Sequence, residues 1–168
     1  NEKGEIEVPG CVRNGISEKV ANKIFDNMID FASYAFNKSH AAAYAVIGFQ
    51  TAYLMRYYPT EYLAAMLNSF MNNSEKVSEY IRSAENLGIQ ILPPDINESY
   101  SKFTVKGDTI RFGLAAIKNV GVNVVDGIVE ARKNKGKFES LVDFINKIDL
   151  STINKRAVES LIKAGAFD

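Results

Sequence analysis

The sequence has few of the residues from which catalytic and metal sites are usually built. It contains one cysteine, Cys11, and one histidine, His40, and it has no tryptophan. A single cysteine excludes an intramolecular disulfide and a cysteine-based zinc site. With one histidine and one cysteine, a catalytic triad or a zinc site lacks the partners that it needs. The low cysteine content fits a reducing compartment, and we therefore expect a cytoplasmic protein.

Paired carboxylates are also missing. No Asp-x-Asp pair occurs, and Glu61, Asp95, Glu98 and Asp108 lie in different sequence contexts. Two-metal phosphoryl chemistry requires carboxylates that hold both ions close together. We therefore expect no catalytic residue, no bound metal and no cofactor in this chain. This favours either a binding module or part of an enzyme whose chemistry lies elsewhere.

The chain has neither a strong net charge nor an apolar run long enough to cross a membrane. Twenty basic residues balance twenty acidic ones, so the whole chain has no general attraction for nucleic acid. The most apolar segment, residues 41–55, is interrupted by Gln50 and Thr51 and is followed by Arg56. We interpret it as a buried core helix and expect no membrane contact.

Hydrophobic spacing predicts a mainly α-helical fold with a small β-hairpin insert. The first helix is expected to begin after Ser17, and the second to run from about His40 to Tyr57 with Ser39 as its N-cap. Further helices are predicted from Pro59 or Thr60 and from Asn73 or Ser74. The sequence FTVKGDTIRFG reads as a β-hairpin with Gly107 and Asp108 in its turn.

Three more helices are predicted after the hairpin, in VNVVDGIVEARK, LVDFINKI and NKRAVESLIKAG. The apolar residues expected in the core of the last part are Leu150, Ile153, Val158, Leu161 and Ile162. The double proline at 93–94 marks the expected domain boundary. It separates a helical block, residues 1–92, from the hairpin insert and second helical block, residues 93–168. The chain also begins without Met, which we interpret as the start of an internal piece of a longer protein.

The sequence FNKSH, residues 36–40, places polar groups at the start of the second predicted helix. A helix N-terminus favours anions, and Lys38 adds a full positive charge, while Asn37, Ser39 and His40 add hydrogen-bonding groups. This arrangement is typical of a site for phosphate oxygens. The alternative interpretation is structural: Asn37 and Ser39 cap the helix, and Lys38 and His40 are solvated surface residues.

A second candidate site lies at residues 118–123. The sequence AIKNVGVNVVDGIVEAR resembles the hairpin of helix-hairpin-helix modules, in which a tight glycine turn offers backbone N–H groups to successive phosphates without reading sequence. Val120, Gly121 and Val122 match the turn, and Lys118 and Asn123 lie beside it. Asn119 replaces the usual first glycine, although asparagine tolerates the left-handed conformation. The alternative is an ordinary connection between two helices.

Longer motifs connect the chain with a known family. FNKSHAAAY, QTAYL, YPTEYLAAML, ILPPDIN, FGLAAIKNVG and NKRAVESLIKAGAFD occur in this order. From about residue 10 to 168 the chain resembles the fingers and helix-hairpin-helix region of bacterial DNA polymerase III alpha subunits, the C-family replicative polymerases. FNKSH resembles the DnaE type more than the PolC type.

The resemblance implies a function and a set of partners. It implies that Asn37, Lys38, Ser39 and His40 contact the triphosphate of the incoming nucleotide. It also implies that the backbone at Val120, Gly121 and Val122, with Lys118 and Asn123 nearby, contacts the primer–template duplex. The catalytic aspartates and their Mg²⁺ would lie in the palm domain of the parent chain, and other replisome subunits would bind elsewhere. The isolated chain is therefore expected to be inactive as a DNA polymerase. The alternative is a stand-alone helical DNA-binding or scaffold module.

Overall fold

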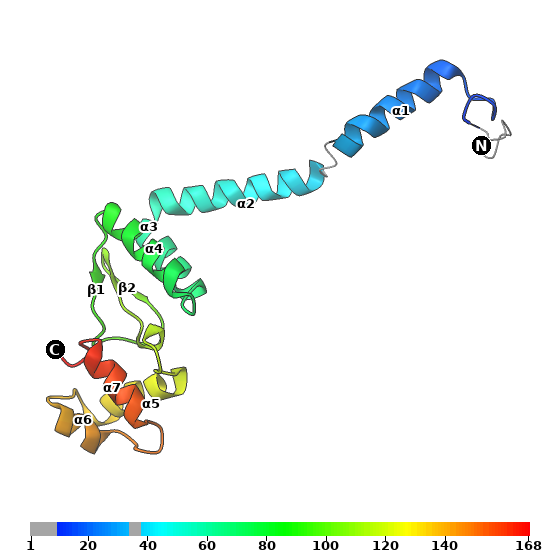
Figure 1. Cartoon of the computed structure of the whole chain (residues 1–168). Helices are drawn as coiled ribbons and strands as arrows, with labels where there is room; N and C mark the ends of the chain where they lie inside the picture. Colours follow the sequence, from blue (N-terminus) through cyan, green and yellow to red (C-terminus); the bar gives the residue numbers. More distant parts are fainter. Residues whose placement is uncertain (1–9, 34–37) are drawn as a thin grey trace. The chain divides into compact units, whose positions relative to one another are not determined.

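The structure is a computed structural model that describes residues 10–33 and 38–168. The chain divides into two compact units, Asn1–Thr51 and Ala52–Asp168, which are described separately. Figure 1 shows the chain and labels most of its helices and strands. The expected domain boundary between residues 92 and 93 stays a prediction.

The first unit contains α1 (Glu18–Ser33) and most of α2 (Lys38–Tyr57), which continues into the second unit. Ser17 directly precedes α1, as predicted, and its carbonyl accepts the N–H groups of Val20 and Ala21, both at 3.0 Å. α2 begins two residues before the predicted start. Ser39 therefore lies in the first turn of this helix, and its prediction as the N-cap is wrong.

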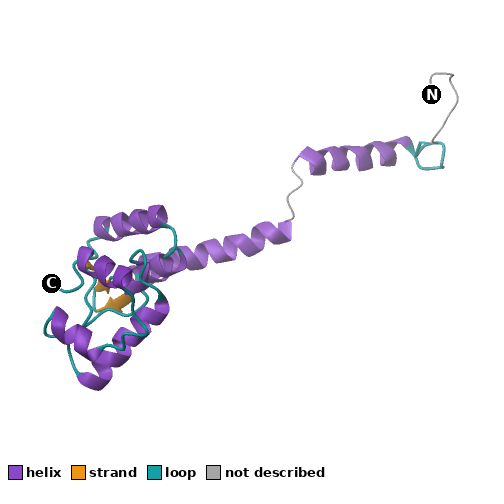
Figure 2. Ribbon diagram, turned by 60° about the horizontal axis from the view of Figure 1, so that its bottom comes forward, coloured by secondary structure: helices purple, strands orange, loops and turns teal. Residues whose placement is uncertain are grey.

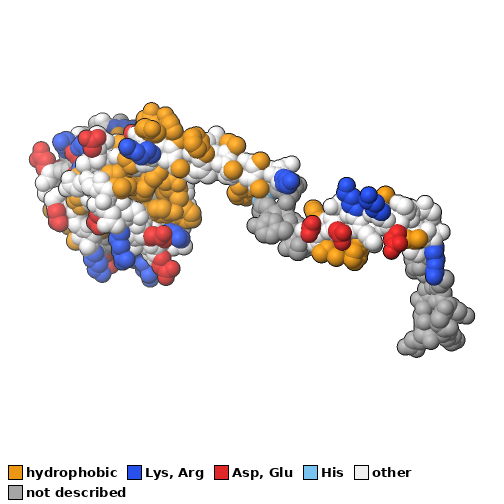
Figure 3. All heavy atoms as spheres, turned by 90° about the horizontal axis from the view of Figure 1, so that it is seen from above, with side chains coloured by type: hydrophobic (Ala, Val, Ile, Leu, Met, Phe, Trp, Pro, Cys, Tyr) orange, Lys and Arg blue, Asp and Glu red, His pale blue; other side chains and the backbone are white. Residues whose placement is uncertain are grey.

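The prediction of a buried core helix at residues 41–55 is also wrong for the described residues. No residue of α2 is buried, and apolar side chains lie at the surface of both α1 and α2 (Figure 3). Tyr44 is 62% exposed and Phe49 is 72% exposed. Apolar residues occur on all sides of α2, and burying such a helix needs packing partners on every side. Near the end of α2, Met55 packs partly buried against the cluster that includes Leu67 and Ile110.

The second unit confirms the mainly α-helical fold with a small β element. α3 begins at Pro59, and α4 has Asn73 as its N-cap, whose side chain accepts the Lys76 N–H at 3.1 Å. Gly88 follows α4 with a φ of 75°. Both helix starts agree with the sequence prediction. The elements of this unit are α3 (Pro59–Ser69), α4 (Ser74–Asn86), β1 (Ile91–Leu92), β2 (Thr104–Lys106), β3 (Thr109–Arg111), the 3₁₀ helix η1 (Leu114–Ala116), α5 (Val122–Lys135), α6 (Leu141–Lys147) and α7 (Lys155–Lys163).

The predicted hairpin forms two strands of a three-stranded sheet with the order β1-β3-β2. Figure 2 shows the strands of this small sheet in orange beside the helices of the second unit. β2 and β3 pair antiparallel, with Val105 opposite Ile110, and Gly107 adopts a φ of 60° in the turn. β1 adds a parallel strand, with Ile91 opposite Ile110. The sequence does not predict this pairing, because a two-residue strand has no usable period.

Two hydrophobic clusters form the core of the second unit. The first lies between α3, α4 and the sheet; Leu67 and Ile110 are fully buried in it. The second lies between η1, α5, α6 and α7. At its centre Phe144 is fully buried. The rings of Phe138 and Phe167 contact the Phe144 ring edge to face, with 5.0 and 5.2 Å between ring centroids.

The core prediction for the last segment is correct at some positions and wrong at others. Leu161 is buried, and Ile153 and Val158 pack partly buried against the second cluster. Leu150 and Ile162 are exposed. Consecutive helical residues point about 100° apart, so Ile162 faces away when Leu161 faces the core. Leu150 lies in the connection between α6 and α7.

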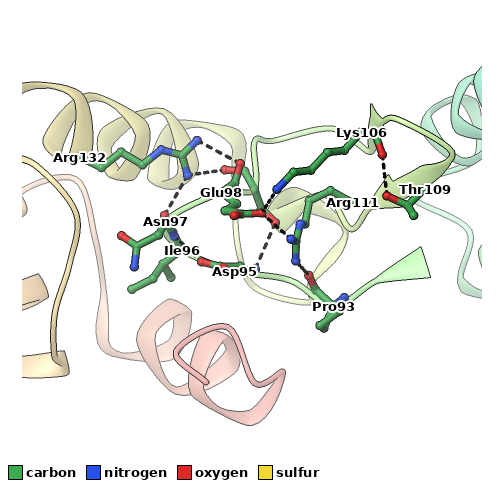
Figure 4. Close-up of polar contacts among 10 residues, drawn as sticks. Pro93, Asp95, Ile96, Asn97, Glu98, Lys106, Thr109, Arg111 and Arg132 are labelled. Carbon is green, nitrogen blue, oxygen red and sulfur yellow. Dashed lines mark hydrogen bonds and ion pairs between the residues drawn. The ribbon is translucent and has the colours of Figure 1, made fainter. Parts of the chain in front are cut away.

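A polar network surrounds the loop at residues 95–99 (Figure 4). From α5, Arg132 donates to the carbonyl oxygens of Ile96 at 2.9 Å and Ser99 at 2.7 Å. On the sheet side, Glu98 accepts hydrogen bonds from Lys106, at 2.7 Å, and from Arg111. The loop thereby connects the sheet with α5.

The charge of Glu98 gives the stability of this network a predicted pH dependence. The hydrogen bond from Lys106 lowers the pKa of Glu98; partial desolvation opposes this, and Arg111 lowers the pKa further. A lowered folded-state pKa contributes stability above the unfolded-state value of about 4.3, and this contribution is lost as the pH falls through the folded-state pKa. We expect Glu98→Gln to have a lower melting temperature than the native chain at pH 7. The difference in melting temperature should shrink between about pH 5 and pH 3. Thermal melts across this range, with exposed Glu85→Gln as the control, measure the effect; a difference independent of pH would contradict it.

Candidate functional site

The hairpin turn joins η1 to α5 and contains an unusual backbone conformation. Asn119 has a φ of 67°, and it is the only non-glycine residue with a positive φ among those described. Asparagine tolerates this left-handed conformation better than most residues. The turn therefore keeps its shape although Asn119 replaces the usual glycine, as the sequence analysis expected.

The N-terminus of α5 is exposed and has no side-chain cap. Gly121 is the N-cap residue, and the first intrahelical hydrogen bond runs from the Val125 N–H to the Gly121 carbonyl, at 3.2 Å. The N–H groups before Val125 have no carbonyl partner within the helix. In contrast, side chains cap α4, α6 and α7. The first turn of α5 also contains no acidic residue, so the positive end of the helix dipole is not offset there.

The structure brings the predicted turn residues together at the surface. Lys118, Gly121, Val122 and Asn123 are exposed, whereas Val120 is 4% exposed and belongs to the second hydrophobic cluster. The buried valine anchors the turn, while its neighbours face solvent. The Val120 N–H donates to the Ile117 carbonyl within the turn, at 3.1 Å.

Gly113 and Gly121, two glycines near the turn, differ in whether the surrounding structure leaves room for a side chain. A Cβ on Gly113 would lie 2.6 Å from the Lys102 carbonyl carbon and 2.7 Å from the Phe103 nitrogen, so packing excludes any side chain there. A Cβ on Gly121 would meet nothing within 4 Å, and its φ of −81° is open to any residue. The fold of the described residues does not require glycine at 121. Glycine there leaves room for another molecule to approach the backbone.

Backbone hydrogen bonds hold η1, and thereby the start of the turn, in place. The Leu114 N–H donates to the Tyr100 carbonyl at 2.9 Å, and the Ala115 N–H donates to the Ser101 carbonyl at 3.1 Å. The close approach at Gly113 permits this pairing. The loop after the double proline therefore supports the turn.

A groove of about 900 Å³ lies beside the turn. The turn residues from Ile117 to Gly121 line one side, and residues of α4 from Ser74 to Ile81 line another, with Phe112 between them. Sequence reasoning missed this groove, because its walls come from segments about forty residues apart and only the tertiary fold brings them together.

The second candidate site lies in the first turn of α2. Lys38, Ser39 and His40 are exposed there, and Asn37 lies outside the described residues. The His40 ring contacts the Tyr44 ring one turn later, with 4.4 Å between centroids. The first turn contains no acidic residue, so Lys38 adds to the positive end of the helix dipole.

Among the residues that the structure describes, no group of three His, Cys, Asp or Glu side chains is arranged to hold a metal ion. In the same part of the chain, no helix is both long and apolar enough to cross a membrane.

Comparisons with known proteins agree with the geometry of the turn. Residues 88–168 match the helix-hairpin-helix motif family. Three curated proteins named DNA polymerase III subunit alpha match nearly the whole chain. The protein from Thermus aquaticus is 50% identical over 96% of the chain, that from Mycobacterium tuberculosis 48% over 95%, and that from Deinococcus radiodurans 46% over 98%.

The chain matches a fragment of DNA polymerase III alpha subunits. This confirms the resemblance predicted from the motifs. The chain spans 13% of the length of the Thermus aquaticus alpha subunit. The helix-hairpin-helix match covers both the turn and α7, so this motif includes most of the second unit.

The contrast between the two glycines gives a stability prediction. We expect Gly113→Ala to lower the free energy of unfolding by about 1–3 kcal/mol, because the added methyl must displace backbone atoms. Gly121→Ala should change it by less than about 1 kcal/mol, because the entropic gain offsets the poorer N-cap. Urea denaturation of both variants measures the difference. Equal destabilisation of the two would contradict the packing role of Gly113.

Proposed function

We propose that this chain is the part of a replicative DNA polymerase III alpha subunit that contacts the primer–template duplex and the incoming nucleotide. The duplex contact is made by the backbone at Val120, Gly121 and Val122, with Lys118 and Asn123 beside it. The observation that carries this proposal is Gly121, a glycine that the fold does not require, at an uncapped helix N-terminus in a helix-hairpin-helix match.

The proposed contact does not read sequence. Backbone N–H groups and a lysine bind phosphate oxygens, which are the same at every base pair. A replicative enzyme needs contact of this kind. Because such contacts release counterions, binding should weaken steeply as the salt concentration rises.

The second part of the proposal concerns α2. Asn37, Lys38, Ser39 and His40 contact the triphosphate of the incoming nucleotide, supported by the exposed first turn, the helix dipole and the charge of Lys38. Lys38 and His40 offset negative charge on the phosphates during transfer. In this proposal the reacting groups and Mg²⁺ belong to the palm of the parent chain, as the resemblance to DNA polymerase III alpha subunits implies. We expect this chain alone to have no polymerase activity.

The duplex contact predicts opposite effects of one substitution on stability and on binding. In Gly121→Ser, the serine caps α5 and restricts the unfolded chain, which should raise stability by roughly 0.5–1 kcal/mol. The same side chain competes for an α5 N–H group and obstructs the phosphate. We expect the Kd for a primer–template duplex to rise about three- to tenfold, as for one lost hydrogen bond of about 1 kcal/mol. Melting curves and fluorescence anisotropy measure the two effects.

Lys118→Ala serves as the matched charge variant. It should reduce the slope of log K against log salt by about 1. A stand-alone DNA-binding module would be favoured by two results together. The isolated chain would bind duplex tightly and with strong salt dependence, and Lys38→Ala and His40→Ala would leave the nucleotide kinetics of the full-length enzyme unaltered. Unchanged duplex affinity in both Gly121→Ser and Lys118→Ala would remove the turn from the interface.

The nucleotide contact predicts a kinetic defect in the full-length polymerase. We expect Lys38→Ala and His40→Ala each to raise the KM for nucleotides or to lower kcat, by about tenfold or more in kcat/KM, because a group that stabilises phosphate charge is lost. Lys38→Arg should retain most of the activity, and Lys23→Ala, an exposed change on α1, is the control. Single-nucleotide incorporation assays measure these constants. Normal kinetics in both alanine variants would exclude the proposed contact.

A further inference from the structure

We propose that the hairpin turn continues into one face of α7, and that Arg156 and Lys163 contact the same duplex as the turn. This inference rests on the proposed function, because it extends the duplex contact to a second element. It begins with a hydrogen bond between the two elements: Asn119 Nδ2 donates to Ser160 Oγ at 3.3 Å across 41 residues of sequence.

The hydrogen bond identifies which face of α7 borders the turn. Arg156, Ser160 and Lys163 lie at positions i, i+4 and i+7, so they share one face of the helix. Arg156 and Lys163 are exposed. Neither belongs to any of the ion pairs formed among the described residues. The acidic residue next to Ser160 is Glu159. Its Oε1 atom lies 3.7 Å from Nζ of Lys155, so Glu159 pairs with Lys155.

The charges on this face suit a phosphate backbone. Lys118 directly precedes Asn119, and Arg156 and Lys163 lie on either side of Ser160 along α7, so three exposed cations flank the Asn119–Ser160 hydrogen bond in sequence. Along α7, Arg156 and Lys163 are about 10 Å apart, at 1.5 Å per residue. This length corresponds to about three phosphate-to-phosphate steps of one strand along the duplex axis. Turn and helix face thus form a single basic strip, defined by Lys118, residues 121–123, Arg156 and Lys163.

The hydrogen bond also gives Asn119 a role that glycine lacks. Glycine would adopt the left-handed conformation more easily, but it has no side chain to reach Ser160. Asparagine provides both the turn conformation and the link to α7. Asn119 and Ser160 are therefore positioning residues that align the two parts of the strip.

The test is a salt titration of duplex binding by the 168-residue chain and its variants, followed by fluorescence anisotropy. Arg156→Ala and Lys163→Ala should each lower the slope of log K against log salt by about 1 and raise Kd several-fold at low salt. Lys133→Ala, which removes the same charge near the far end of α5, should leave the slope unchanged. Circular dichroism confirms that each variant is folded.

The positioning role has its own readout. Asn119→Gly keeps the turn conformation but removes the link, so the melting temperature should change little while the duplex affinity falls. In a Ser160→Ala background, Lys163→Ala should have a smaller effect on Kd than in the native chain, since Lys163 is no longer aligned. An equal effect of Lys163→Ala in both backgrounds would overturn the positioning role.

The outcomes separate this inference from the proposed function. If Lys118→Ala weakens binding but Arg156→Ala and Lys163→Ala do not, the strip is refuted and the contact by the turn stands. If Lys133→Ala lowers the slope as much as Lys163→Ala does, the strip is refuted as well, because the effect is then one of general charge. If the native chain does not bind the duplex, both proposals fail.

Discussion

The loop at residues 95–101 is the constraint on which the rest of the second unit depends. Arg132 of α5 donates to carbonyl oxygens of this loop, and its guanidinium lies 4.8 Å from the centre of the Tyr100 ring. The side-chain amide of Asn97 exchanges two hydrogen bonds with the Phe138 backbone, at 2.9 and 2.8 Å. Glu98 binds two cations of the sheet. The loop therefore connects the two hydrophobic clusters through polar contacts, and its Ile96 is also buried in the second cluster.

The same loop also determines where the hairpin turn begins. Tyr100 and Ser101 accept the N–H groups of η1, and the backbone comes so close at Gly113 that a side chain is excluded. From this fixed start, Asn119 reverses the chain and buried Val120 anchors it, so that α5 begins with its N–H groups facing solvent. Glycine is thus required for packing at one end of this segment. At the other end the fold of the described residues does not require glycine at 121, because a Cβ there would meet nothing within 4 Å.

Local features of the sequence were predictable, and features that depend on tertiary packing were not. The start of α3 at Pro59, the cap at Asn73 and the hairpin turn at Gly107 each follow from the chemistry of one or a few residues. The left-handed conformation of Asn119 follows from the turn pattern around it. The parallel pairing of β1, the groove beside the turn and the Asn119–Ser160 hydrogen bond join segments between about 20 and 40 residues apart, and no local pattern encodes them. The burial of α2 was wrongly predicted because apolar composition shows only that a helix favours burial, and not what covers it.

The two candidate sites differ in how much of their support lies in this chain. The hairpin turn is held by the second hydrophobic cluster, by the loop at residues 95–101 and by α7, all within the described residues. Its geometry is therefore a property of the chain itself. The first turn of α2 belongs to a helix without a buried residue, so the described residues do not fix the position of Lys38 or His40 against a substrate. Catalytic groups act only when packing holds them in place to within a fraction of an ångström. If α2 contacts a nucleotide, the surfaces that orient it must therefore come from the remainder of the alpha subunit.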